Sequence, residues 1–201
     1  MRNLGHIVPL SMIVLGTAVA PKLARAELAP AALDHHNQGG VSLMPGLGYR
    51  VIVPYSDNKT CGDSSGDAGK RVCTNMVPIF LDLQLSFGVS RRIDLITDLR
   101  FGLGKDPASN THQFALAPGV RFWLDQDVAL KFYTTVQLLY DNTDYHGVLA
   151  SNDFGLRNSN GLMYDVIRNV GFFFQFGESF GFRRWFRIEL DAGVGIQVRF
   201  P

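Results

Sequence analysis

The chain has 201 residues, of which 46% are hydrophobic and only 18% are charged, and its formal net charge is +1. This length suits one domain of ordinary size, and the apolar content excludes an intrinsically disordered chain. The nearly neutral charge argues against a nucleic-acid partner, because nucleic-acid binders normally carry a basic patch or stripe.

The first 26 residues have the pattern of a cleaved export signal. Arg2 supplies a short basic region, and residues 7–20 form an apolar stretch of signal-peptide length. Ala24 and Ala26 then provide an A-x-A cleavage site, which makes Glu27 the expected first residue of the mature protein. The sequence therefore predicts export from the cytoplasm.

Residues 27–40 are predicted to form a short N-terminal arm. This segment contains Asp34-His35-His36, which are residue types that ligate metals. A transition-metal site needs ligands that converge from rigid elements, and a short arm does not supply them. We therefore expect a mobile arm and no metal site.

Cys61 and Cys73 are the only cysteines, and they bracket a polar segment rich in Gly, Ser and Asp. In an oxidising compartment, two cysteines in this arrangement predict a disulfide. Closing a loop of this size restricts the unfolded chain by about 3 kcal/mol in the chain-entropy model.

From residue 41 onward, apolar residues alternate with polar or small ones. Successive side chains of a strand point to opposite faces, so this period of two predicts strands. Between Met76 and Val89, for example, Val77 and every second residue after it are apolar, which places Met76 and Phe80 on the other face. We predict eight strands, near residues 41–55, 76–90, 93–104, 113–124, 128–141, 154–167, 170–178 and 185–200.

The connections between these strands alternate in length. Those after the second, fourth and sixth strands are tight, and those after the first, third and fifth are longer and rich in Asp, Asn, Ser and Gly. An even number of strands with short turns at one rim and long loops at the other is typical of outer-membrane barrels.

The alternation itself fits either a membrane barrel with its apolar face outward or a lipocalin-like carrier with its apolar face inward. The opposite face decides between them, because it carries a nearly balanced set of charges together with many small residues, as a narrow closed lumen requires. Aromatic residues near strand ends, among them Phe87, Phe122 and Phe200, fit interfacial girdles.

We expect an all-β, closed antiparallel up-and-down transmembrane barrel over residues 41–201. Its predicted lumen charge network consists of Arg50, Asp82, Asp94, Asp98, Arg100, Arg121, Lys131, Asp165, Arg187, Glu189 and Asp191.

The C-terminal strand supports this architecture. Asp191, Gly193, Ile196 and Val198 follow a polar-x-Gly-x-x-hydrophobic-x-hydrophobic pattern, and Phe200 supplies a terminal aromatic residue, although Pro201 follows it. This pattern resembles the signal with which bacterial outer-membrane barrels end and which their assembly machinery reads. The mature chain resembles the eight-stranded barrels of the outer-membrane protein A and X type. The resemblance implies the bacterial outer membrane as location, with membrane lipid and the assembly machinery as partners and a monomer as the expected state.

No catalytic, metal-binding or cofactor-binding residues are predicted. The lipid A deacylases of this fold carry a His-x-Ser motif, and the sequence contains none. We therefore expect a non-enzymatic barrel with a side-chain-filled lumen, whose role is envelope-structural or lies in surface interactions of its loops. Two alternatives stay open at this point: a narrow pore for small solutes, and a secreted lipocalin-like carrier of an apolar ligand.

Overall fold

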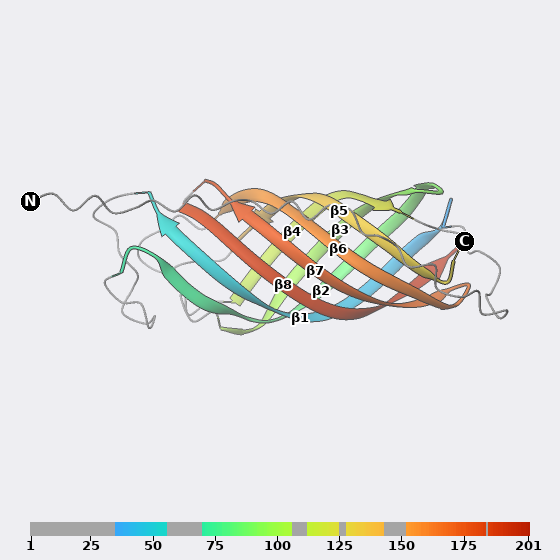
Figure 1. The fold of residues 1–201 in the computed structure, drawn as a ribbon, viewed down its shortest axis with the longest axis horizontal. Coiled ribbons are helices and arrows are strands. Elements are labelled where there is room, and N and C mark those ends of the chain that lie inside the picture. Colours follow the sequence, from blue (N-terminus) through green and yellow to red (C-terminus); the bar gives the residue numbers. More distant parts are fainter. Residues whose placement is uncertain (1–34, 56–69, 106–111, 125–127, 143–151, 184) are drawn as a thin grey trace, which may run out of the picture.

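The computed structural model describes residues 35–55, 70–105, 112–124, 128–142, 152–183 and 185–201. These residues form a single closed barrel in which every strand pairs antiparallel with its neighbours in the sequence and β1 closes the ring against β8 (Figure 1). The predicted fold class is confirmed. The strands are β1 (Gly39–Pro54), β2 (Cys73–Ser90), β3 (Ile93–Lys105), β4 (His112–Trp123), β5 (Leu130–Asp141), β6 (Asp153–Ile167), β7 (Val170–Gly181) and β8 (Trp185–Phe200).

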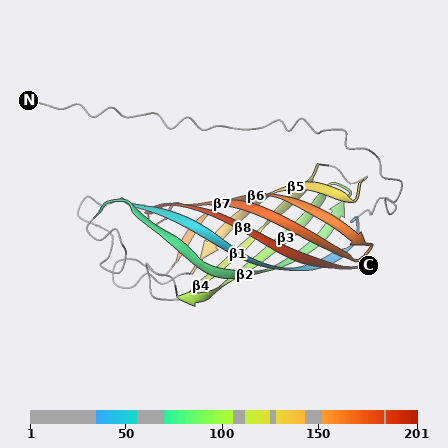
Figure 2. The same ribbon diagram turned by 60° about the horizontal axis from the view of Figure 1, so that its bottom comes forward.

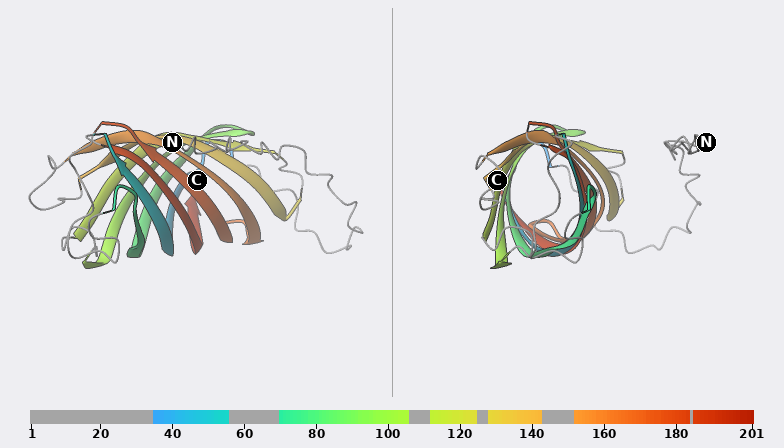
Figure 3. Two further views of the ribbon diagram at one scale, coloured as in Figure 1. Left: turned by 60° about the vertical axis from the view of Figure 1, so that its left-hand side comes forward. Right: turned by 90° about the vertical axis from the view of Figure 1, so that its left-hand side faces the viewer.

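Both ends of the barrel sheet lie at one rim. Gly39 at the start of β1 is the register partner of Phe200 at the end of β8, and the second view places the beginning of β1 beside the C-terminus (Figure 2). β2, β4 and β6 end, and β3, β5 and β7 begin, at this same rim, which we call the short-turn rim. The view along the barrel shows that the strands enclose one narrow lumen (Figure 3).

The period of two sorts side chains between the lumen and the outer surface. Along β5, Lys131, Tyr133 and Thr135 are buried in the lumen, whereas the intervening Leu130 and Phe132 are exposed. The same division holds around the ring, so apolar side chains cover the outside and charged ones are buried inside. This orientation is the reverse of a lipocalin, and it excludes the carrier with an apolar interior.

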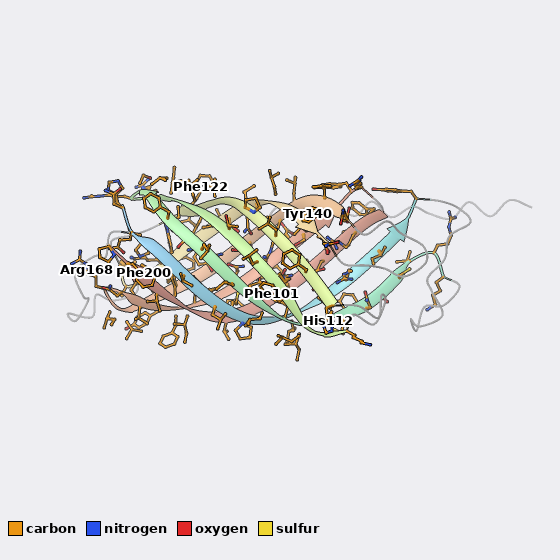
Figure 4. The ribbon with its side chains drawn as sticks, turned by 180° about the vertical axis from the view of Figure 1, so that it is seen from behind. Phe101, His112, Phe122, Tyr140, Arg168 and Phe200 are labelled. Atoms are coloured by element: carbon orange, nitrogen blue, oxygen red, sulfur yellow. The ribbon has the colours of Figure 1, made fainter. Side chains whose placement is uncertain are left out.

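Aromatic side chains project outward near both ends of this apolar surface. Phe122 and Phe200 lie toward the end that also carries Arg168, whereas Phe101 and Tyr140 lie nearer the other end (Figure 4). Such rings of aromatic residues are typical of the two interfaces of a membrane barrel.

One part of the alternation was predicted incorrectly. Val77 is buried at 3% exposure and Met76 is exposed at 55%, the reverse of the faces expected for them. The cause is a register shift between β1 and β2, where Gly46 pairs with Phe80 but Gly48 pairs with Val77. β2 therefore contains one extra residue beside Pro78, which has no N–H to donate to the ladder, and such a bulge inverts the faces beyond it.

Two further predictions fall wholly or partly outside the described residues. The export signal, with Ala24, Ala26 and Glu27, lies there, as does Cys61. Cys73 begins β2, is buried, and is the register partner of Ile52 on β1. Within the described residues, no helix is long and apolar enough to span a membrane.

Candidate functional site: the charged lumen

The centre of the lumen is organised around the guanidinium group of Arg100 on β3. Arg100 donates two hydrogen bonds to Asp82 on β2, from Nε at 2.8 Å and from Nη2 at 2.9 Å. It also donates to Glu189 at 2.8 Å and to Asp191 at 3.1 Å, both on β8. Its guanidinium carbon lies 3.7 Å from the centroid of the Phe80 ring. One cation thus joins three carboxylates from two strands and lies against an aromatic face.

A second arginine, Arg157 on β6, reaches two of these carboxylates and that of Asp98 from the opposite wall. It forms ion pairs with Asp82 at 3.2 Å, Asp98 at 3.3 Å and Asp191 at 3.1 Å. The carboxylate of Asp98 also accepts hydrogen bonds from two buried glutamines, Gln84 on β2 and Gln137 on β5. Because each acid here has more than one donor, the network can keep its charges buried without leaving a carboxylate unpaired.

The rim opposite the short turns is also closed by charges. Arg187 on β8 forms an ion pair with Asp141 on β5 and lies 3.8 Å from Asp153 on β6. Between this pair and the central arginines lies a cavity of about 10 Å³, lined among others by Gln113, Asp141 and Arg187. A space of this size holds roughly one water molecule. The two central arginines, Arg100 and Arg157, line this cavity together with Arg187.

Apolar and aromatic side chains also fill part of the lumen. Met44, Val77, Phe80, Trp123, Tyr133, Met163 and Phe173 form one buried cluster. Three of the rings lie over a glycine of the neighbouring strand: a Cβ added at Gly46, Gly161 or Gly195 would overlap Phe80, Tyr133 or Phe173, respectively. The glycines of the lumenal face therefore make room for the aromatic filling.

At the short-turn rim itself, Asp165 on β6 is surrounded by cations. Its carboxylate accepts from Lys131 on β5 at 2.6 Å and pairs with Arg199 on β8. Across the lumen from it, Asp94 on β3 accepts a hydrogen bond of 2.9 Å from the Trp123 indole, and Arg121 lies 3.8 Å from the same carboxylate.

His35 completes this end of the lumen, contrary to the expectation of a mobile arm. Its side chain is buried, with Nε2 lying 3.4 Å from Asp165 and 3.0 Å from Lys131, and its ring meets Trp123 edge-on. A turn holds it there: the Asn37 N–H donates to Gly88 O at 2.8 Å, and Asn37 has a φ of 58°, which asparagine tolerates. A Cβ at Gly88 would overlap the backbone of His35, so only glycine fits. Residues 35–38 thus act as a plug in the short-turn rim.

We expect this plug to make stability dependent on pH. Burial lowers the pKa of the His35 imidazole below its ordinary value of 6.5, and the nearby Arg199 and Lys131 charges add to that effect. Below about pH 6.5 the unfolded chain therefore binds a proton that the folded chain resists, so the free energy of unfolding falls as the pH decreases toward the lowered pKa. Asp165 opposes the shift through its hydrogen bond to the imidazole.

The measurement is urea unfolding at pH 8 and pH 5 for the natural chain and for His35→Gln, which cannot titrate. We expect the variant to lose part of the pH dependence. Equal pH dependence in the natural chain and His35→Gln would contradict this role of His35.

The lumen brings together the eleven residues proposed from sequence as a charge network, and each of them is buried. Arg50 pairs with Glu189 at 3.1 Å, which connects it to the Arg100 cluster. Sequence reasoning did not place Arg157 or His35 in this network. Arg157 shares its face with the lumenal Asp165 at an even spacing, and this signal in the sequence was sufficient to find it. Nothing in the strand pattern marks His35.

The C-terminal residues are divided between the two faces of β8. Ile196, Val198 and Phe200 are exposed on the outside, whereas Asp191 belongs to the lumenal network and Gly193 lies over Met44. Recognition of this segment by an assembly machinery stays a proposal. Among the described residues, no group of three or more His, Cys, Asp or Glu side chains is arranged to hold a metal ion.

Comparison with known proteins identifies the fold. No protein-family model matches the chain, and no curated protein matches its sequence. Similar solved structures include the N-terminal β-barrel domain of OprF from Pseudomonas aeruginosa, with 10% identity and a TM-score of 0.55, covering 82% of this chain and 98% of that one. Neisserial surface protein A follows, with 11% identity and a TM-score of 0.53 over 80% and 97% of the two chains.

The outer membrane protein OprG of Pseudomonas aeruginosa is similar over 83% of this chain and 98% of its own, with 14% identity and a TM-score of 0.50. At such low identities the likeness concerns the fold. The chain therefore has the fold of the eight-stranded outer-membrane barrels.

Proposed function

We propose that this chain is a non-enzymatic barrel of the bacterial outer membrane, exported through its N-terminal signal and carrying its activity on the surface loops opposite the short-turn rim. The observation that carries the proposal is the placement of polarity. Exposed apolar side chains surround the barrel, whereas most of the charged side chains of the strands, such as Arg50, Asp82 and Arg100, are buried in the lumen. An apolar surface of this extent is unstable in water and suited to lipid.

The state of the lumen supports a structural or surface-interaction role over transport. The central arginines bridge carboxylates from several strands, and the space left beside them is about 10 Å³. Passage of even a small solute requires these ion pairs to separate inside a narrow barrel. The narrow pore is therefore the weaker of the two functions that suit a membrane barrel.

Two measurements test this proposal. In detergent electrophoresis of the outer-membrane fraction, a folded barrel resists unfolding until it is boiled, so we expect different mobilities for boiled and unboiled samples. The reconstituted protein is expected to show no steady single channels in a planar bilayer. Recovery as a soluble protein without a mobility shift contradicts the membrane location, whereas regular conductance steps contradict the closed lumen and favour the pore.

The predicted disulfide belongs to the same proposal, because Cys61 and Cys73 bracket the connection between β1 and β2. We expect the unboiled, folded protein to contain no thiol that reacts with maleimide, and reduction in denaturant to expose two. Labelling of the folded protein without reductant would show that the two cysteines are not joined.

A further inference from the structure

The outer surface is polar in one place within the membrane-facing strands. Outward-facing side chains of the described strand interiors are otherwise apolar or glycine, apart from Thr97 on β3. On β5, β6 and β7 four polar side chains adjoin one another, and we call them the outer polar cluster: Thr134, Asn158, Asn160 and Glu178.

Register and hydrogen bonds connect these residues across three strands. Asn158 is the partner of Glu178 across β6–β7, and Asn160 is the partner of Thr134 across β5–β6. The Asn158 amide donates to Glu178 Oε1 at 3.2 Å, and the Thr134 hydroxyl donates to Asn158 Oδ1 at 3.4 Å. Neither hydrogen bond uses the amide of Asn160, whose side chain is the most exposed of the four.

The cluster lies near the middle of the apolar surface. On β6, the outward aromatic residues nearest the two ends are Phe154 and Tyr164. With a rise of about 3.3 Å per residue and a strand tilt of about 40°, they are separated by roughly 25 Å along the barrel axis, which is the height of a membrane-spanning apolar band. Asn158 and Asn160 lie on either side of the midpoint between them.

At this depth neither water nor lipid supplies hydrogen-bonding groups. An amide or a carboxyl exposed to hydrocarbon has an unfavourable free energy, and ionisable residues within a membrane commonly mark functional sites. The polar groups of lipids lie at the interfaces, on the far side of the aromatic residues. A partner that satisfies Asn160 and Glu178 must therefore be a second protein that presents polar groups at the same depth.

We propose that the outer polar cluster is the centre of a contact between two copies of this chain within the membrane, an inference that rests on the membrane location proposed above. A two-fold contact pairs a surface with itself, so residue i of each copy meets residue j of the other. The cluster suits such pairing because it has both donors and acceptors: the Asn160 amide of each copy can donate to the Glu178 carboxyl of the other. These hydrogen bonds are surrounded by exposed apolar side chains, those of Val136, Leu156 and Phe176. The monomer expected from the sequence is the outcome that would contradict this proposal.

Cross-linking tests whether the two clusters face each other. In a chain with Cys61→Ser and Cys73→Ser, a single cysteine is introduced as Asn160→Cys in one preparation and as Glu178→Cys in a second, and the two are mixed, reconstituted in phosphatidylcholine vesicles and oxidised. We expect a disulfide-linked dimer. The matched control is Thr97→Cys, which places a cysteine at the outward-facing polar position on β3, and we expect it to stay largely monomeric.

Sedimentation equilibrium in density-matched detergent tests the contact with both natural cysteines in place. We expect the natural chain to sediment as a dimer and the triple variant Asn158→Leu, Asn160→Leu, Glu178→Leu to sediment as a monomer, with Thr97→Leu still dimeric. Both variants should keep the mobility shift on boiling, which shows that the barrel has folded.

The proposal is overturned if the natural chain sediments as a monomer and the mixture of Asn160→Cys and Glu178→Cys cross-links no more than Thr97→Cys. It is also overturned if Asn160→Cys in intact outer membranes couples to a protein of different mass instead of its own copy. Loss of the boiling shift in the natural chain itself would instead mean that the membrane location is wrong.

Discussion

Replacing Arg100 with methionine should lower the free energy of unfolding by about 3–5 kcal/mol, which is the usual cost of removing one partner from a buried ion pair. Methionine keeps much of the side-chain volume against Phe80, so the loss comes mainly from charge. Asp82 loses both of its hydrogen bonds from Arg100, and Glu189 and Asp191 lose one each. The measurement is urea unfolding of the reconstituted barrel.

Two variants show whether this cost arises from the ion pairs. Arg92→Met removes an exposed arginine from the β2–β3 turn, and we expect it to change stability by less than about 0.5 kcal/mol. Combining Arg100→Met with Asp82→Asn should recover part of the loss, with a coupling of about 0.5–3 kcal/mol. The second change removes a buried carboxylate that has lost its two hydrogen bonds from Arg100 and keeps the one from Arg157. If Arg100→Met is as stable as Arg92→Met, water screens the lumen and the narrow pore becomes the better proposal.

The barrel could be predicted from sequence because its pattern is set residue by residue. A side chain on a strand faces either lipid or the lumen, so each position reports its own environment through its polarity. This local rule identified eight strands, and it identified Asp82 and Arg100 as sharing one face. It did not require knowledge of which strands pair.

The misassigned residues are those whose position depends on contacts distant in sequence. Val77 faces the lumen because a bulge at Pro78 inverts the faces of β2, and alternation alone does not reveal a bulge. His35 lies before the first strand, and its burial depends on a turn fitted against Gly88, more than fifty positions further along the chain. The pairing of each arginine with several carboxylates likewise follows from the closure of the ring, which brings β3 and β6 to β8 across the lumen.

Introducing an arginine at Val194 should destabilise the barrel by about 2–4 kcal/mol, as expected for a cation on the lipid face at the middle of the membrane. Val194 points outward from β8 with 61% of its surface exposed. It lies near the middle of the interval between the outward aromatic residues Phe186 and Phe200. On a surface in contact with water, an arginine at such an exposed position would cost little.

The same substitution near the short-turn rim is the matched control. Val89 is also outward and exposed, but it lies at the end of β2 beside the turn that contains Arg91. Close to the interface an arginine costs only about 0–1 kcal/mol, because its long side chain reaches the polar headgroups. Urea unfolding of Val194→Arg and Val89→Arg in the same lipid vesicles therefore compares one chemical change at two depths. A stability difference of less than about 0.5 kcal/mol between them would mean that the apolar surface does not span a membrane. In that case Asn160 would not lie at the middle of a membrane either.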